Sequence, residues 1–251
     1  MKIAKFVYEG NIRWGVLSGN NVHQIKGTLY NMTGVGSRIC SASNIEYLAP
    51  VLATSKVPAI AANYGDKDDR DGPGIFMKQP GTYQAHRKGI VFPRSCKTII
   101  HEAELGIVIS KKGRHIEEQD ALDHVLGYTC VNDVSAKEMI TSDQGKGTSM
   151  RWKHFDTFCP IGPFIETEVS DPNNLNIECL VNGKISASGN TSDMIFPVSK
   201  LISWVSEVMT LNPGDIIPTG CPETAEIVVG DVVEVKIEDV GSLINTVVKD
   251  Y

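Results

Sequence analysis

The chain has 251 residues, of which 41% are hydrophobic, and a formal net charge of -6 at pH 7. A chain of this length and composition can bury a substantial core in one or two domains. The negative charge and the scattered basic residues argue against a nucleic-acid partner, which requires a basic face. No apolar run has the length of a membrane-spanning helix, and residues 1–7 are typical of a strand rather than of a signal peptide. We therefore expect neither a nucleic-acid nor a membrane partner.

The cysteines indicate a reducing compartment. They are widely spaced and form no C-x-x-C pair, in a chain much longer than most disulfide-stabilised domains. We expect reduced, mostly buried thiols in a cytoplasmic protein, and neither disulfides nor a zinc site. The six are Cys40, Cys96, Cys130, Cys159, Cys179 and Cys221.

The N-terminal part of the chain is predicted to be a small β domain, residues 1–55, followed by a catalytic domain over residues 56–251. Strands at 5–8 and 13–17 flank Glu9-Gly10, a turn signal typical of a hairpin. Residues 20–25 could supply a third strand.

A buried strand and then a polar loop are expected next. Residues 59–64 are apolar, whereas residues 65–74 combine Gly and Pro with mixed charge and are therefore expected to be exposed. Two interpretations of this loop stay open: a surface loop without a role, or a lid over a site.

Strands dominate from residue 99 onwards. Short β-branched segments predict strands at 105–109, 177–181 and 232–237, and Asn182-Gly183 predicts a tight hairpin turn. Apolar stripes with helical spacing predict helices over 117–126 and 198–209. The pattern as a whole favours a β-rich α+β fold.

Three carboxylates stand in two otherwise apolar segments: Glu102, Glu104 and Asp133. In a strand, Glu102 and Glu104 face the same side, and Asp133 follows a strand-like segment that could lie beside them. Buried like charges are costly unless a cation cancels them, and an all-oxygen cluster suits Mg²⁺. The E-x-E pattern alone is weak evidence, because acids on the solvent face of a strand look the same.

Together with its neighbours, this acid pattern resembles the fumarylacetoacetate hydrolase superfamily over about residues 59–251. Within it, the chain is most similar to the isomerase/decarboxylase branch of homoprotocatechuate degradation (2-hydroxyhepta-2,4-diene-1,7-dioate isomerase-like). The matching pieces are Asn63-Tyr, Phe76-Met-Lys-Gln-Pro, Glu102-Ala-Glu-Leu, Gly127-Tyr-Thr-Cys-Val-Asn-Asp-Val-Ser, Lys153-His-Phe-Asp-Thr-Phe-Cys-Pro-Ile-Gly-Pro, Val181-Asn-Gly, Leu211-Asn-Pro-Gly-Asp and Thr219-Gly-Cys-Pro.

The resemblance implies a mixed β roll, usually dimeric, with a metal site. It implies Mg²⁺ or Mn²⁺ (Ca²⁺ is also possible) on Glu102, Glu104 and Asp133. It also implies that Lys153 reaches the metal site and a substrate oxygen. The implied substrates are 2-oxo acids of aromatic catabolism or their enols, chelated through the carboxylate and the adjacent carbonyl.

The chain departs from the superfamily pattern at several expected site positions. The His and Glu of the lid motif Asn-Tyr-x-x-His-x-x-Glu are replaced by Lys67 and Arg70. Lys137 stands where an arginine is usual, and Cys221 where a threonine contacts substrate in relatives. Ser186-Ala187 replaces the usual Arg-Gln.

These departures weaken water activation more than they weaken metal chemistry. A charged lysine such as Lys67 is a poor base, whereas a divalent cation with Lys153 can stabilise an enolate. His86 could supply a base from elsewhere, and His101 is expected to pack away from the metal face. We expect Cys221 to line the pocket. Lys78 and Lys137 either hold a distal carboxylate of the substrate or are surface lysines.

Three hypotheses follow for the function. The first is a metal-dependent decarboxylase or isomerase of an enolisable 2-oxo mono- or dicarboxylic acid, acting through an enolate. The second is an acylpyruvate-type C–C hydrolase with a relocated base. The third is a family member without catalysis or repurposed in biosynthesis, because the His–Glu dyad is absent.

Overall fold

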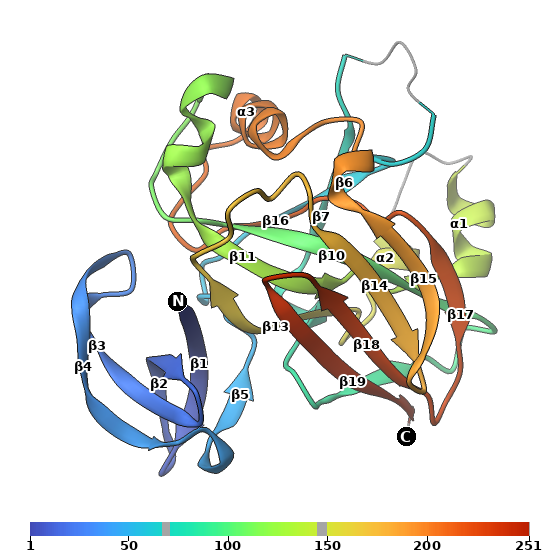
Figure 1. Cartoon of the computed structure of the whole chain (residues 1–251). Helices are drawn as coiled ribbons and strands as arrows, with labels where there is room; N and C mark the ends of the chain where they lie inside the picture. The colour runs from blue at the N-terminus through green and yellow to red at the C-terminus, as the bar shows by residue number, and fades with distance from the viewer. Residues whose placement is uncertain (67–70, 145–149, 251) are drawn as a thin grey trace.

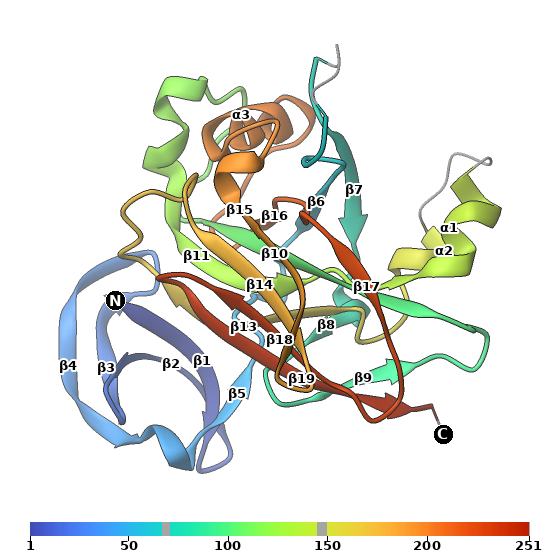
Figure 2. The ribbon, with the colours of Figure 1, turned by 45° about the vertical axis from the view of Figure 1, so that its right-hand side comes forward.

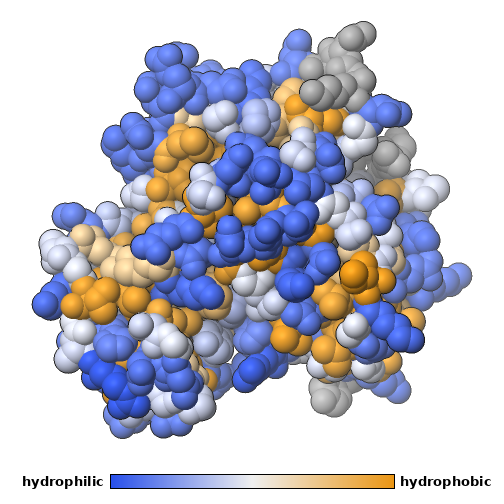
Figure 3. Space-filling model, in the orientation of Figure 1, coloured by the Kyte–Doolittle hydropathy of each residue, from blue (hydrophilic) through white to orange (hydrophobic). Residues whose placement is uncertain are grey.

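The computed structural model describes residues 1–66, 71–144 and 150–250. It is the β-rich α+β fold expected, built mainly from two sheets, one of twelve strands and one of five. None of the helices in the described ranges has the length and apolar character needed to span a bilayer. The molecular face in Figure 3 is mostly hydrophilic, with small separate apolar areas.

The N-terminal strands form one wing of the larger sheet, at the lower left of Figure 1. Glu9 and Gly10 form the first hairpin turn with φ of 49° and 72°, the left-handed values that such a turn requires. These strands are β1 (Lys2–Tyr8), β2 (Asn11–Ser18), β3 (Asn21–Thr28), β4 (Asn31–Ser41) and β5 (Glu46–Leu48).

The wing joins the rest of the molecule through backbone pairing. β1 pairs with β13 (Cys159–Glu166) in the register Ile3↔Ile165, and the N-terminal amine forms an ion pair with Glu166. The sheet therefore runs from the N-terminal unit into the rest of the chain, and the domain boundary at residue 55 stays a prediction.

The longest buried strand is β10 (Ile99–Ile109), which lies at the centre of the molecule (Figure 1). All of its residues are buried, and apart from His101, Glu102 and Glu104 they are apolar or glycine. The strand therefore does not show the alternation of buried and exposed residues typical of a half-exposed sheet. It pairs with four strands, namely β11 (Val125–Asn132), β12 (Ser135–Ala136), β16 (Ile216–Pro218) and β17 (Thr224–Ile227).

The five-stranded sheet packs against the central strands. Leu105 and Ile107 of β10 belong to the same core cluster as Cys179, Val235 and Ile237 of this sheet. Its strands, in spatial order, are β15 (Lys184–Asn190), β14 (Asn176–Val181), β18 (Val232–Ile237), β19 (Gly241–Lys249) and β9 (Gly89–Phe92).

The predicted hairpin turn between β14 and β15 is confirmed. Asn182 and Gly183 have φ of 52° and 76°, the conformation that Asn-Gly adopts at low cost.

The structure confirms one predicted helix, changes the type of the other and contains two helices that were not predicted. α3 (Val198–Val208) matches the prediction over 198–209, whereas the segment predicted over 117–126 is a 3-10 helix, Glu118–His124. The short helices α1 (Lys137–Gln144) and α2 (Met150–Lys153) were not predicted. The remaining 3-10 turns are Ala42–Asn44, Pro80–Thr82 and Thr191–Asp193.

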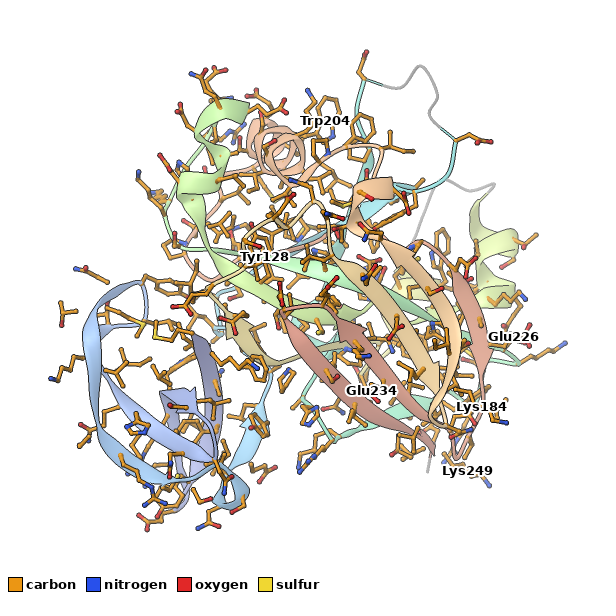
Figure 4. All side chains as sticks on the ribbon, viewed as in Figure 1. Tyr128, Lys184, Trp204, Glu226, Glu234 and Lys249 are labelled. Carbon is orange, nitrogen blue, oxygen red and sulfur yellow. The ribbon has the colours of Figure 1, made fainter. Side chains whose placement is uncertain are left out.

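A separate two-stranded ribbon covers the end of β10 where the acids lie. It consists of β6 (Val57–Ala61) and β7 (Gly74–Lys78), and β8 (Tyr83–Gln84) follows and pairs with β13. Figure 2 shows β7, α1 and α2 on the side of β10 opposite the N-terminal wing. The chain just before β7 is anchored on α3, where the indole of Trp204 donates a 3.1 Å hydrogen bond to the Pro73 carbonyl (Figure 4).

Candidate active site

Glu102 and Glu104 lie on β10 and both line one cavity, as the two-residue period of a strand predicts. His101 points elsewhere, with Nε2 3.0 Å from the Ser186 hydroxyl. Burial lowers the pKa of His101 to about 4, so this imidazole is neutral at pH 7.

Asp133 is positioned by backbone pairing between β10 and β11. Ala103 pairs with Asn132, which places the next residue, Asp133, beside Glu102. The Asp133 amide donates to the Glu102 carbonyl at 2.9 Å, and the Glu102 amide donates to Oδ1 of Asn132 at 3.0 Å. The relative position of the two acids is therefore set by the sheet itself.

The three carboxyl groups share a cavity of about 200 Å³ with Lys153 and Cys221. One wall comes from the β6–β7 ribbon and the chain that follows β6. The other lining residues are Ile60, Ala61, Ala62, Tyr64, Phe76 and Gly220.

Lys153, the last residue of α2, forms ion pairs with two of the acids. Its Nζ lies 2.6 Å from Oε2 of Glu102 and also contacts Oδ2 of Asp133. Burial alone would lower the pKa of Lys153, but the neighbouring Asp133, Glu102 and Glu104 outweigh it and raise this pKa above its usual value. The ammonium is therefore charged, and it lies 5.0 Å from the centre of the Phe76 ring.

Lys78 is not a surface lysine. Its side chain is fully buried, its Nζ lies 2.6 Å from Oδ1 of Asp133, and it donates a 2.9 Å hydrogen bond to the Phe158 carbonyl. Both oxygens of Asp133 thus face a lysine. Burial opposes ionisation of Asp133, yet Lys153 and Lys78 hold its pKa below the usual value.

Glu104 forms no ion pair with either of these lysines. It is 1% exposed, and its Oε2 accepts a 2.9 Å hydrogen bond from the Gly220 amide. In the described part of the chain no basic side chain lies at ion-pair distance from it. Burial, together with Asp133, raises the pKa of Glu104 well above its usual value. Two lysines therefore face three buried acids, and the third acid lacks a cation.

Cys221 stands beside Glu104 at the end of the segment 216–221. Its Sγ and one carboxylate oxygen from each of Glu102 and Glu104 lie within 4.8 Å of one another. Gly220 has a φ of +90°, and a Cβ there would lie 3.0 Å from the Cβ of Asn63, so this position requires glycine. Asn63 in turn donates a 2.9 Å hydrogen bond to the Thr219 carbonyl.

Some predicted site residues lie elsewhere. Lys137 is exposed and forms a 2.7 Å ion pair with Glu226, which lies on β17 at the right edge of Figure 4, so it does not line the cavity. Lys67, like Arg70, lies outside the described residues. His86 packs edge-on against Tyr47, its Nδ1 accepts a 3.1 Å hydrogen bond from the Ile244 amide, and it is not a cavity residue.

Sequence reasoning missed Tyr64 and Phe76 as cavity residues. Both lay within the motif pieces, but nothing in the sequence indicated that the chain after β6 crosses the acid cluster. The Tyr64 hydroxyl is buried and has no hydrogen-bond partner among the described residues. Burial, with Glu104 and Cys221 nearby, raises its pKa above the usual value, so the phenol is neutral.

Comparison with known proteins identifies the family. A family model for the fumarylacetoacetate hydrolase C-terminal region matches residues 48–248. The chain belongs to the fumarylacetoacetate hydrolase family. A second model, for the Rv2993c-like N-terminal region, matches residues 1–37.

Relatives of this fumarylacetoacetate hydrolase family member include tautomerases and isomerases. A mitochondrial oxaloacetate tautomerase (fahd2) of Xenopus laevis is 40% identical over 84% of this chain and 70% of its own length. The crystal structure of 5-carboxymethyl-2-hydroxymuconate delta-isomerase from Mycobacterium smegmatis is 32% identical, with a TM-score of 0.93 over both whole chains. That of 2-hydroxyhepta-2,4-diene-1,7-dioate isomerase from Mycobacterium marinum is 34% identical, with a TM-score of 0.90 over 100% of this chain and 99% of that one.

A hydrolase of the same fold is also similar. Maleylpyruvate hydrolase from Sphingobium sp. SYK-6, solved in complex with manganese(II) and pyruvate, is 28% identical, with a TM-score of 0.83 over both whole chains. The family therefore contains isomerases, tautomerases and hydrolases, and this chain is an enzyme of that general kind.

Proposed function

We propose that this chain is a divalent-metal-dependent enzyme that acts on a small, enolisable 2-oxo acid by isomerisation, including keto–enol tautomerisation, or by decarboxylation. The observation that carries the proposal is Glu104, a buried carboxyl group without an ion-pair partner among the described residues, in a cavity that already holds two further acids and Lys153. The tautomerase and isomerase relatives support the same reaction class.

The donor set fits a hard divalent cation. Glu102 and Glu104 present carboxylate oxygens to the cavity, with Asp133 beside them. Such ions prefer oxygen ligands, and an ion here would supply the positive charge that Glu104 lacks. We propose that Glu102, Glu104 and Asp133 hold Mg²⁺ or Mn²⁺; the Mn²⁺ found in the Sphingobium hydrolase structure supports a metal of this kind. When bound, such a cation polarises a carbonyl and stabilises negative charge that develops on its oxygen.

Lys153 would stabilise the same developing charge. Its ammonium lines the cavity and donates to Glu102, to Oδ2 of Asp133 and, at 3.3 Å, to the Asp133 carbonyl, so one of these hydrogen bonds would be exchanged for one to a substrate oxygen. Phe76 and Ile60 supply apolar walls that reduce access of water. A low local dielectric strengthens this stabilisation.

Tyr64 is our candidate for the remaining polar contact with substrate. Its neutral phenol is buried at the cavity without a partner among the described residues, and a bound acid would provide the acceptor. The cavity formed by the described residues, about 200 Å³, is smaller than the roughly 300–1,000 Å³ typical of drug-sized ligand sites, which favours a compact substrate.

Hydrolytic C–C cleavage is the second candidate. The Sphingobium maleylpyruvate hydrolase supports it, because its chemistry occurs on this fold. Hydrolysis needs a base that activates water, and no histidine lines the cavity in the described part of the chain. This composition favours isomerisation or decarboxylation.

The proposal is tested with protein stripped by a chelator and then supplied with Mg²⁺ or Mn²⁺. Oxaloacetate and related 2-oxo acids serve as substrates; enol absorbance follows tautomerisation, and released CO₂ follows decarboxylation. We expect turnover only in the metal-loaded protein. Equal turnover with and without metal would refute the proposal. Metal binding without turnover of any of these acids would favour a non-catalytic protein.

The hydrolase alternative is tested in the same preparation with an acylpyruvate in ¹⁸O-labelled water. Pyruvate together with a labelled second acid would establish hydrolysis. Absence of label in the products would exclude it.

A further inference from the structure

Cys221 brings a sulfur atom into a cavity whose other metal-binding candidates are oxygens. Its Sγ, one oxygen of Glu102 and one oxygen of Glu104 lie within 4.8 Å of one another. Around one ion, an oxygen at about 2.1 Å and a sulfur at about 2.3 Å are roughly 3.6 Å apart at a tetrahedral angle. Side-chain shifts of about an ångström would therefore let all three atoms contact the same ion.

The chain holds Cys221 and Glu104 together. The Gly220 amide donates to Oε2 of Glu104, and Cys221 is the next residue along the backbone. Gly220 itself is restrained by its close approach to Asn63. This hydrogen bond therefore ties the segment that carries the sulfur to the carboxylate on β10.

Glu104 is the independent sign that a cation belongs at this point. Its side chain is 99% buried and lines the cavity, and it has no basic partner among the described residues, whereas Glu102 and Asp133 both contact Lys153. The carboxyl group without an ion pair thus lies next to the cysteine.

We propose that Cys221 is a further ligand of the bound metal, so that a thiolate joins the carboxylates of Glu102, Glu104 and Asp133 around the ion. This inference rests on the proposed function, because it concerns the ion of that site. On coordination the thiol proton leaves to solvent and the metal takes its place on sulfur. Thiolate is a soft ligand that Mg²⁺ does not favour, so the site prefers softer ions such as Co²⁺, Zn²⁺ or Cd²⁺ over Mg²⁺.

Cobalt spectroscopy gives a readout that does not depend on activity. Co²⁺ is titrated into the metal-free wild type, into Cys221→Ser, and into Cys96→Ser as the matched control. Cys96 lines a separate surface hollow with Phe92 and Arg94. We expect a sulfur-to-cobalt charge-transfer band in the near ultraviolet for the wild type and for Cys96→Ser, and no such band for Cys221→Ser.

Binding affinities provide the second measurement. We expect Cys221→Ser to weaken Cd²⁺ binding at least about tenfold, since even loss of a residue that only supports a ligand costs about 10–100-fold. Mg²⁺ affinity should change far less in the same variant. Cys221→Thr, which has the residue usual in relatives, should behave like the serine variant. Circular dichroism confirms that each variant is folded.

The outcomes separate this inference from the proposed function. If Co²⁺ binds the wild type without a charge-transfer band, or if Cys221→Ser keeps its Cd²⁺ affinity, Cys221 is not a ligand; metal-dependent turnover can then still be observed. If no divalent ion binds the wild type, both proposals are wrong.

Discussion

Glu104 illustrates how one residue can reveal what a site requires. Its neighbours Glu102 and Asp133 both have Lys153 within ion-pair distance, and Asp133 also has Lys78. An isolated buried carboxylate is costly, and a protein normally avoids it or shifts its pKa. A fold that keeps such a group at a cavity therefore points to a cation that binds there.

Replacing Glu104 by glutamine tests this residue. We expect the metal-free variant to be as stable as the wild type or slightly more so, because a neutral amide replaces a buried carboxyl group whose ionisation burial opposes. We expect metal affinity and turnover to be largely lost. Calorimetric titration with Mn²⁺ measures the metal affinity, and the oxaloacetate assay measures turnover. Glu223→Gln, an acid outside the cavity lining, is the control.

His86 predicts a pH dependence of stability. Its Nδ1 accepts a hydrogen bond from the Ile244 amide, and protonation of Nδ1 would break this bond. Burial lowers the pKa of His86 from 6.5 to about 4. Between pH 4 and 6.5 the unfolded chain binds this proton more readily than the folded chain does. The contribution of neutral His86 to the unfolding free energy is therefore complete above pH 6.5 and is lost as the pH falls towards 4. At pH 5 the loss amounts to at most about 2 kcal/mol.

The measurement is urea unfolding of the wild type and of His86→Asn between pH 4 and 8. Asparagine offers an oxygen acceptor near the Nδ1 position and does not titrate. We expect the variant to lose less stability on acidification. Parallel curves for the two proteins would show that His86 does not contribute. His115→Asn, at an exposed site, should leave the curve unchanged.

Among the helices and strands, sequence periodicity predicted the long elements but not the short helices. The alternation along β10 was enough to place Glu102 and Glu104 on one side. The amphipathic stripe of α3 was likewise enough to locate that helix. α1 and α2 could not be found in this way, because they are short and α1 has no strong apolar face. Short helices depend on tertiary contacts for their stability, and those contacts are not local in sequence.

Lys78 shows what β7 contributes to the site. It connects this strand to Asp133, and through the Phe158 carbonyl to the chain before β13. Lys78→Met removes one partner of a buried ion pair, and we expect a loss of about 3–5 kcal/mol in unfolding free energy. Denaturant unfolding checks this value.

The matched control for that experiment is Lys137→Met, which breaks the exposed pair with Glu226. Exposed pairs contribute only about 0–1 kcal/mol. Similar losses in the two variants would contradict the structural role of Lys78.

At the scale of the whole molecule, the site joins segments far apart in the chain. Residues around 60, 76, 102, 133, 153 and 220 meet at one cavity, between the β6–β7 ribbon, the central strands and α2. The N-terminal wing pairs with β13 and does not contribute a lining residue among those described. A ligand bound in the cavity therefore couples the segments of the larger, C-terminal part.

This arrangement predicts that metal stabilises the whole fold. At a Mn²⁺ concentration of 100 times its dissociation constant, the unfolding free energy should rise by about 2.7 kcal/mol, because the ion binds the folded chain and not the unfolded one. Thermal unfolding with and without Mn²⁺ measures the shift. An equal shift in Glu104→Gln would show that the ion binds elsewhere.

The fold class, the family, the side of β10 on which two acids lie and the turn at Asn182-Gly183 could all be predicted from the amino-acid sequence. These follow from local periodicity, turn chemistry and the order of motif pieces. Four features became visible only in the folded chain: Lys78 is buried against Asp133, Lys137 is exposed, Tyr64 lines the cavity, and Glu104 has no ion-pair partner among the described residues. Burial and ion pairing depend on which distant segments pack together, and no periodicity within one segment encodes that neighbourhood.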